Sequence, residues 1–300
     1  MTPKALTPIK KRLIDASVEI QGEPLEQISF QHSLLCQVGL PRKETPEREF
    51  TRVNGAMSLS IEAGQLFDGT QLVKQPLPYG ARPRLILVHI SSEAVRTRSP
   101  IIEVGNSAYA FLKTLGFDTN GQSYRQTRKQ VLALVACHMT LGFMADGHPQ
   151  TVKTAPIRKF EAWMRREGNQ TVMWPGVLEL SGEFFASLQE HAVPLDPVAL
   201  KGLRHSSLAL DVYTWLAQRL CRVNRLDGVR VSWKALQGQF GQEITDPNNF
   251  RRKMLKTLRE VKAVYPDARF EAVHGGLLLK PSAPPITKQA VQLALPDRSG

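Results

Sequence analysis

A predicted helix near the end of the sequence carries side chains suited to reading bases in duplex DNA. Its polar row recurs at helical spacing and comprises Asn248, Arg252, Lys256 and Arg259, flanked by Asn249, Arg251 and Lys253. Arg can donate two parallel hydrogen bonds to guanine, Asn can pair with adenine, and Lys supplies charge for phosphate contacts. A helix fits the DNA major groove, which is about 12 Å wide, so this face predicts sequence-specific binding.

The other face of the same helix is apolar. Phe250, Met254, Leu258 and Val261 lie at positions i, i+4, i+8 and i+11, which places one stripe against a core. Residues 247–263 hold six basic residues and one acidic residue, which leaves a charge of +5 on one helix. A solvated basic surface is the alternative interpretation, and DNA binding is favoured because Asn residues begin the helix and a hairpin follows it.

A weaker counterpart lies in the first half of the chain. Arg125, Arg128 and Lys129 lie in the early turns of a helix predicted from about Tyr124 to Met139, and they suffice for phosphate contacts. The rest of that helix is apolar, so a purely structural role is an equal alternative. Two more cations, Arg96 and Arg98, follow an earlier predicted helix and either bind phosphates or are simple surface residues.

The elements around these helices follow one plan. Asp196-Pro197 and Asp246-Pro247 each combine an N-cap residue with proline at the first helical position. The second half reads as helices, a strand near 229–231, a short helix after Ser232, the basic helix, and strands 269–273 and 277–279 around a glycine turn. This is the order of a winged helix, a helix-turn-helix variant with a strand hairpin as its wing.

The predicted fold class is therefore α+β, with two tandem winged-helix domains and a small β-rich N-terminal extension. The predicted divisions are a flexible tail over 1–27, the β-rich element over 28–78, a first winged helix over 79–192 for phosphate contact or dimerisation, a second over 193–282 for sequence-specific DNA binding, and a flexible tail over 283–300.

Composition narrows the possible functions. The 300 residues carry 39 Lys and Arg against 27 Asp and Glu, and a net charge of +12 favours polyanionic partners, nucleic acid before acidic membrane surface. No apolar run approaches the roughly 20 residues of a membrane-spanning helix, and residues 1–11 lack the apolar stretch of a signal peptide. We therefore expect a cytoplasmic protein without a membrane partner. Three scattered cysteines predict no disulfide framework.

The sequence shows no recognisable catalytic centre. It lacks a phosphate-binding Gly-x-x-x-x-Gly-Lys-Ser/Thr loop, a His-x-His metal pair, a His-x-x-Arg element and an Asp-x-Asp pair. We therefore expect no enzymatic activity, no cofactor and no metal. A nuclease or strand transferase that uses Tyr109, Tyr124 or Tyr213 as nucleophile is the alternative from another class.

Several motifs resemble those of the plasmid-encoded replication initiators of RepA type. The first-half motifs are the segments 77–84, 92–99, 102–107 and 111–116. The second-half motifs are the segments 193–196, 208–219, 233–241 and 250–255, and upstream only 30–36 looks related. The resemblance covers about Leu77 to Ser282.

This resemblance implies a bacterial protein, associated with plasmid or nucleoid, that binds direct repeats in a plasmid origin. It also implies that the protein helps to open adjacent AT-rich DNA and recruits the host initiator ATPase and replicative helicase. Related initiators repress their own gene as dimers and initiate as monomers, so a homodimer is expected as a second state. A dimeric transcriptional repressor without an initiation role is the alternative that the DNA-binding helix supports equally.

Overall fold

The computed structural model describes residues 6–22, 27–104, 108–145, 147–167, 170–241 and 243–295. It has a mixed α+β fold, as predicted. The chain forms two compact units: Gln31–Ala192, here called the central unit, and Met1–Phe30 with Val193–Gly300, here called the terminal unit. The chain passes between them within strands β1 (Ser29–His32) and β11 (Ala192–Leu195), which pair with each other.

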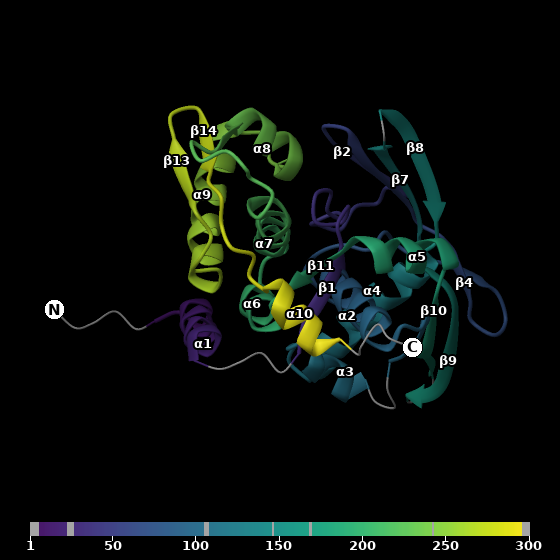
Figure 1. The fold of residues 1–300 in the computed structure, drawn as a ribbon. Coiled ribbons are helices and arrows are strands. Elements are labelled where there is room, and N and C mark those ends of the chain that lie inside the picture. The colour runs from purple at the N-terminus through teal and green to yellow at the C-terminus, as the bar shows by residue number, and fades with distance from the viewer. Residues whose placement is uncertain are drawn as a thin grey trace. The chain divides into compact units, whose positions relative to one another are not determined.

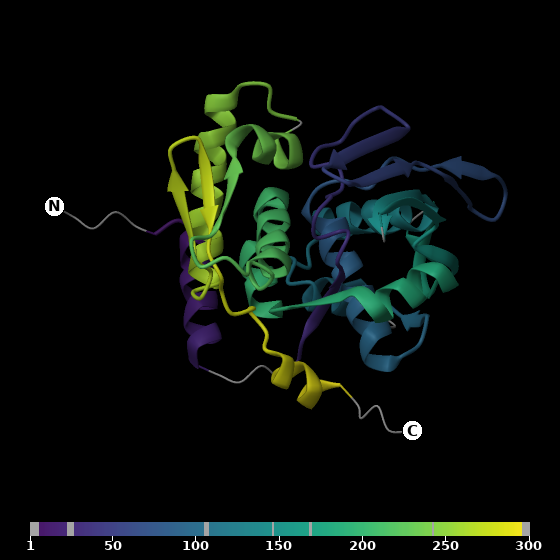
Figure 2. The ribbon, with the colours of Figure 1, turned by 45° about the horizontal axis from the view of Figure 1, so that its top comes forward.

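The terminal unit has the order of elements predicted for a winged helix (Figure 1). Its elements are α6 (Pro197–Leu203), α7 (Ser207–Leu220), β12 (Val229–Ser232), α8 (Trp233–Phe240), α9 (Pro247–Val264), β13 (Phe270–Val273) and β14 (Gly276–Leu279). The three strands form an antiparallel sheet in the order β12-β14-β13. Figure 2 shows the hairpin of β13 and β14 lying along α9, so the wing flanks the basic helix.

The N-terminal segment departs from the prediction of a flexible tail. Pro8–Gly22 forms helix α1, which packs against α6 and α9. Leu13 and Ala16 are buried there, and a Cβ on Gly202 of α6 would lie 3.1 Å from the Cβ of Ala16. The sequence of α1 is weakly amphipathic, so burial against the rest of the terminal unit, rather than its own pattern, stabilises it. Residues 1–5 and 23–26 of the predicted tail lie outside the described residues.

The predicted C-terminal tail also contains a helix. Lys288–Ala294 forms α10, which begins where the Thr287 side chain accepts a hydrogen bond from the amide of Ala290. Residues 296–300 lie outside the described residues.

Part of the central unit has an order of elements similar to that of the terminal unit, with two further strands, His138–Ala145 and His148–Thr154, inserted between the fourth and fifth of the elements named next. Its corresponding elements are α2 (Ala81–Thr97), β6 (Ile101–Glu103), α3 (Ala108–Thr114), α4 (Gly121–Ala136), β9 (Ile157–Glu167) and β10 (Gln170–Leu180). The sheet order β6-β10-β9 matches β12-β14-β13 of the other unit. Helix α5 (Gly182–His191) follows, and the hairpin of β4 (Gln65–Phe67) and β5 (Leu72–Lys74) forms a separate sheet.

The predicted β-rich extension is not a separate element. Strands β2 (Glu49–Asn54) and β3 (Met57–Glu62) join β7 (His138–Ala145) and β8 (His148–Thr154) in one sheet, in the order β2-β3-β7-β8. Met139, predicted to end a helix, instead pairs with Ile61 of β3, and both side chains are buried. Helix α4 therefore ends at Ala136, because β7 adds to the sheet directly after it.

No helix within the described ranges has the length and apolarity needed to cross a membrane.

Candidate nucleic-acid interface

Helix α9 begins and packs as its sequence predicts. The Asp246 carboxylate accepts hydrogen bonds from the amides of Asn248 and Asn249 at 3.0 and 3.1 Å, and Pro247 starts the helix. The predicted apolar stripe is confirmed, since Phe250, Met254, Leu258 and Val261 are all at most 3% exposed. This packing fixes which side of α9 faces outward.

The outward side carries the predicted cations. Arg251, Arg252, Lys253, Lys256 and Arg259 are exposed, as is Asn248, and Asn249 is half-buried. All seven predicted residues of α9 therefore lie on or beside one accessible surface, which we call the α9 face. The structure brings them together in a single helix 18 residues long.

Individual side chains of the α9 face differ in what holds them. An Nη2 hydrogen of Arg252 is donated to Asn249 Oδ1 at 3.2 Å, which couples these two residues. Lys256 Nζ lies 3.8 Å from Glu260 Oε1, and the other oxygen of Glu260 lies 3.4 Å from His205 Nε2. Lys253 and Arg259 have no hydrogen bond or ion pair to the rest of the described chain.

Two further contacts join α9 to its surroundings. The Arg251 guanidinium lies 5.4 Å from the centre of the Trp233 ring, at the start of α8. Lys262 Nζ donates to the carbonyls of Pro266 and Ala268 at 2.8 and 2.6 Å, so this cation ties down the end of the helix. Lys262 therefore contributes to the turn into the wing rather than to the α9 face.

Two glycines allow the tight turn and the close strand pairing of the wing, which lies beside the α9 face. Gly275 has a φ of +79°, which favours glycine, and a Cβ on Gly276 would lie 2.1 Å from the Val231 carbonyl oxygen. Strands β12 and β14 thus approach too closely at this point for any side chain. On the outer strand, Glu271 accepts a hydrogen bond from Lys280 Nζ at 2.6 Å.

The three predicted cations of the central unit lie within the first nine residues of α4. The Asn120 side chain accepts a hydrogen bond from the amide of Ser123 at 2.9 Å, and Ser123, Thr127 and Gln130 form the buried side of the helix. Arg125 and Lys129 are exposed, one turn apart, and Arg128 is half-buried. The cluster exists, but Lys129 has an internal partner.

That partner is Glu44, in the loop before β2. Lys129 Nζ donates to Glu44 Oε1, Tyr79 donates its hydroxyl hydrogen to Glu44 Oε2 at 2.9 Å, and Lys129 Nζ lies 5.6 Å from the Tyr79 ring centre. The hydrogen bond from Lys129 lowers the pKa of Glu44 and raises that of Lys129, whereas burial raises the pKa of Tyr79. A phosphate that approaches Lys129 therefore competes with a carboxylate.

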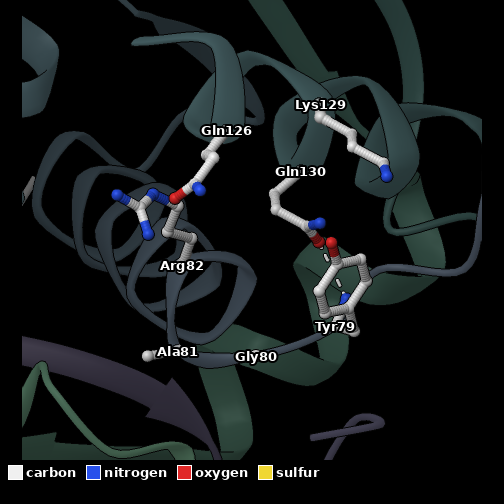
Figure 3. Close-up of a pocket in the computed structure, with 7 residues that line it drawn as sticks. All are labelled: Tyr79, Gly80, Ala81, Arg82, Gln126, Lys129 and Gln130. Carbon is white, nitrogen blue, oxygen red and sulfur yellow. Dashed lines mark hydrogen bonds between the residues drawn. The ribbon is translucent and has the colours of Figure 1, made fainter. Parts of the chain in front are cut away.

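A small cavity of about 170 Å³ lies beside this cluster, at the start of α2. It is lined by Tyr79, Gly80, Ala81, Arg82, Gln126, Lys129 and Gln130. Figure 3 shows Gln126 and Gln130 directed from α4 toward the segment that begins α2. The Arg82 guanidinium donates to Thr127 and Ser123 at 3.0 and 3.1 Å, and burial lowers its pKa.

The other predicted cations, Arg96 and Arg98, lie at the far end of α2. Arg96 pairs with Glu93 within the helix, and Arg98 ends it in the left-handed conformation. Fourteen residues separate Arg96 from Arg82, or about 21 Å of helix at about 1.5 Å per residue. Since Arg82 contacts the first half of α4, the structure does not bring Arg96 together with the α4 cations.

The tyrosines of the nuclease alternative have different environments. Tyr213 is fully buried, and its hydroxyl accepts a hydrogen bond from the amide of Asp196 at 2.9 Å, so it has no access to DNA in this structure. Tyr109 is 60% exposed and Tyr124 is half-buried. Within the described ranges, no group of three or more His, Cys, Asp or Glu residues is arranged to hold a metal ion.

Sequence reasoning missed the residues that surround the α4 cations. Glu44 and Lys129 are 85 positions apart, and no periodicity joins a charged loop to a helix at that distance. The motif at residues 77–84 could have pointed to this region, because one of its side chains contacts the loop that contains Glu44. Buried Arg84 donates to the carbonyls of Leu40 and Pro41 at 2.6 and 3.1 Å, which fixes the loop that leads to Glu44.

Comparison with solved structures finds a similar fold in two crystal structures of RctB domains 2 and 3. Domains 2 and 3 of RctB, crystallised as selenomethionine derivatives, match with a TM-score of 0.53 and 11% identity over 80% of this chain and 88% of that chain. A second structure of RctB domains 2-3 matches with a TM-score of 0.50 and 11% identity, over 80% and 85% of the two chains. At this identity the likeness concerns the fold alone.

Comparison with curated protein sequences finds no match. The sequence profile of the family described as plasmid-encoded RepA protein matches residues 77–235. This range is more than half of the chain and runs from the segment before α2 into α8, across both units. The chain belongs to the family of plasmid-encoded RepA proteins.

Proposed function

We propose that this protein initiates plasmid replication by binding directly repeated origin DNA through two tandem winged-helix domains, without enzymatic activity of its own. In this role it promotes opening of the adjacent duplex and recruits the host initiator ATPase and replicative helicase. Membership of the RepA family supports the replication role. The matching order of elements in the two units supports the tandem arrangement.

The observation that carries the proposal is the α9 face. Five exposed cations and two asparagines share one surface of a helix whose opposite side is buried, and a hairpin flanks it. Side chains at the N-terminal end of such a helix reach base edges when it lies in a major groove, while the wing and neighbouring cations contact the backbone. Lys253 and Arg259 are available for DNA without breaking an internal contact.

Within this proposal the central unit contributes phosphate contacts through Arg125 and Arg128 or else serves as a dimerisation unit. The Lys129–Glu44 pair reduces the charge that α4 offers to DNA. Phosphate contacts position a protein on duplex without reading sequence, so the terminal unit supplies the specificity.

The test begins with footprinting on the DNA that flanks the protein's own gene. A variant with Arg252, Lys256 and Arg259 changed to Ala is expected to lose the footprint. The matched control changes Lys10, Lys11 and Lys201 to Ala, which removes three exposed lysines from the same unit but outside α9. Loss of the footprint in both variants, or in neither, would refute the assignment of the α9 face.

A second experiment separates initiation from the two alternatives. A plasmid that carries the footprinted DNA but lacks an initiator gene should replicate when the protein is supplied in trans. Binding without replication would favour the repressor. Strand cleavage that is lost in Tyr109→Phe or Tyr124→Phe would favour the nuclease, since both tyrosines are at least partly accessible.

A further inference from the structure

We propose that the outer edge of strand β13 binds an extended segment of a partner protein that carries apolar and acidic side chains. The segment would extend the sheet β12-β14-β13 by one strand and place its apolar side chains in a cavity between α9 and the hairpin. This inference goes beyond the proposed function, because it concerns a protein partner and does not require that the chain bind DNA.

The backbone of β13 has an open edge. Within the described residues this strand is the last of its sheet and pairs with β14 alone. The amide of Lys280 donates to the carbonyl of Arg269 at 2.9 Å, so Arg269 and every second residue after it direct their backbone groups toward β14. The N–H and C=O groups of Phe270 and Ala272 therefore point outward, and no hydrogen bond in the described part of the chain uses them. Such a row of unpaired groups can pair with a strand from another chain.

An apolar cavity of about 330 Å³ lies beside the same two residues. Its apolar wall includes Leu255 and Leu258 of α9 together with Phe270, Ala272 and Leu277 of the hairpin. Leu258 and Leu277 are at most 3% exposed, so the cavity reaches the core of the terminal unit. Leu277 is buried but its cross-strand partner Ala272 is exposed, because α9 covers β14 and leaves part of β13 open. Alternate side chains of a strand added at this edge would enter the cavity.

The charges at the cavity favour an acidic partner. Arg259 and Lys262 line it from α9, and none of the described residues that line it is acidic. Arg259 has no hydrogen bond or ion pair within the described chain, and Lys262 Nζ donates to the Ala268 carbonyl at 2.6 Å, close to the start of β13. Pairing of β13 with β13 of a second copy would bring these cations near their own equivalents, and like charges repel. A partner segment with a carboxylate two residues from an apolar side chain directs both groups toward the cavity.

The primary test uses the full chain, labelled with ¹⁵N, and capped peptides of the sequence Thr-Xaa-Thr-Glu-Thr-Xaa-Thr, in which Xaa is Leu, Val or Phe. Saturable binding of at least one of these peptides is expected, together with slower hydrogen exchange at the amides of Phe270 and Ala272. The amides of Glu271 and Val273 face β14 and serve as internal controls, because their exchange should change less.

Altered peptides separate the contribution of charge from that of strand pairing. A peptide with Lys in place of Glu should bind much more weakly, because it would face two cations. Methylation of one alternate set of peptide amides should abolish binding, whereas methylation of the other set should not. Only one row of amides in an added strand faces its neighbour, so this difference reports pairing and is not expected of a nonspecific apolar contact.

Variants of the protein test the cavity and its cations. Ala272→Phe should fill the cavity and weaken peptide binding about tenfold, as loss of an anchor pocket does, with thermal unfolding as the check that the unit is folded. The matched control His274→Phe adds the same ring at the exposed turn of the hairpin and should bind normally. Arg259→Gln should weaken binding several-fold, and Lys253→Gln, at an exposed cation of α9 that does not line the cavity, should not.

Four results would overturn the proposal. The first is that none of the acidic peptides binds saturably, and the second is that the two methylated forms bind alike. Slower exchange of the Phe270 and Ala272 amides with rising protein concentration alone would assign the edge to a second copy. Protection of these amides by a random-sequence duplex, but by no peptide, would assign it to DNA. Peptide binding can be measured whether or not the chain binds an origin, so its failure is distinct from failure of the proposed function.

Discussion

Side chains of the α9 face differ in whether another residue holds them in place. Arg252 is held by Asn249, and such coupling orients a guanidinium before it meets a base. Lys253 and Arg259 extend without partners within the described structure, which suits contacts to phosphates that tolerate variable geometry. In the DNA-binding role that we propose, the same helix therefore has separate residues for reading bases and for contacting phosphates.

Replacing Arg252 with Ala should cost about 1 to 3 kcal/mol of specific binding and relax preference at one base pair, as loss of a bidentate base contact does. Lys253→Ala is the matched control and should weaken all duplexes alike. Competition binding with single-base substitutions in the site measures both effects. Equal selectivity in Arg252→Ala and the unchanged protein would contradict the base-reading role.

His32 makes the stability of the central unit depend on pH. Its ring is 4% exposed, stacks on Phe184 at 5.7 Å, and uses both nitrogens: Nδ1 accepts from the Leu34 amide at 3.2 Å, and Nε2 lies 2.9 Å from Ser187 Oγ. Burial, and then the charge of His191, lower the pKa of His32 from 6.5 to about 4. The folded state thus binds its proton less readily than the unfolded chain.

Stability from His32 should therefore be complete above about pH 6.5 and decline as the pH falls toward 4, because between these two pH values His32 is mostly protonated in the unfolded chain and mostly neutral in the folded chain. The loss at pH 4 is at most about 3 kcal/mol. Hydrogen exchange of amides in α5 measures it, and His32→Gln should flatten the profile. His148→Gln, at an exposed histidine, should leave the slope intact, and a similar flattening there would contradict this account.

At the level of elements, the strand pairing of the wing requires glycine at position 276, where β12 and β14 lie too close for a side chain. Gly276→Ala should destabilise the terminal unit by about 1 to 3 kcal/mol, because its Cβ would meet the Val231 carbonyl of β12. Gly238→Ala in α8, where nothing lies within 4 Å of the new Cβ, should instead stabilise it by about 0.5 to 1 kcal/mol. Thermal unfolding compares the two, and equal shifts would refute this packing.

The cations of helix α4 lead to a prediction about how DNA affinity depends on salt concentration. Each cation that contacts DNA releases counterions, so Arg125→Ala with Arg128→Ala should reduce the logarithmic salt slope by about 0.9 per lost contact and leave sequence preference unchanged. Lys113→Ala with Arg158→Ala removes equal charge from the same unit as a control. An unchanged slope in the α4 variant would assign the central unit to dimerisation.

Local pattern explains which elements the sequence predicts well. The start of α9 follows from Asp246 and Pro247, and its buried side follows from apolar spacing, because both signals lie within a few turns. Pairing of β3 with β7 joins residues about 80 positions apart, and α1 is stabilised by α6 and α9 from the other end of the chain. Such contacts produce no periodic pattern in the sequence, so the sequence predicts a separate β-rich element at β2 and β3 and a flexible tail at α1.

At the level of the whole molecule, the tandem arrangement that we propose joins two different winged helices in one chain, without two-fold symmetry between them. A monomer that places both on DNA should recognise a non-palindromic site, and successive major-groove faces about 34 Å apart give protection over about two turns of duplex. Stoichiometry and footprints on one direct repeat and on an inverted pair test this. One protein per direct repeat fits the initiator, and exclusive two-to-one binding to inverted sites would support the repressor.

The placement of α1 affects how the chain folds during translation. This helix belongs to the terminal unit, yet about 170 residues separate it from Val193, where the rest of that unit begins. At about 5 to 20 residues per second, the ribosome needs roughly 10 to 30 s to synthesise them. Leu13 and Ala16 therefore leave the ribosome long before α6 and α9 exist to bury them, and α1 can pack only after Val264, the last residue of α9, has been synthesised.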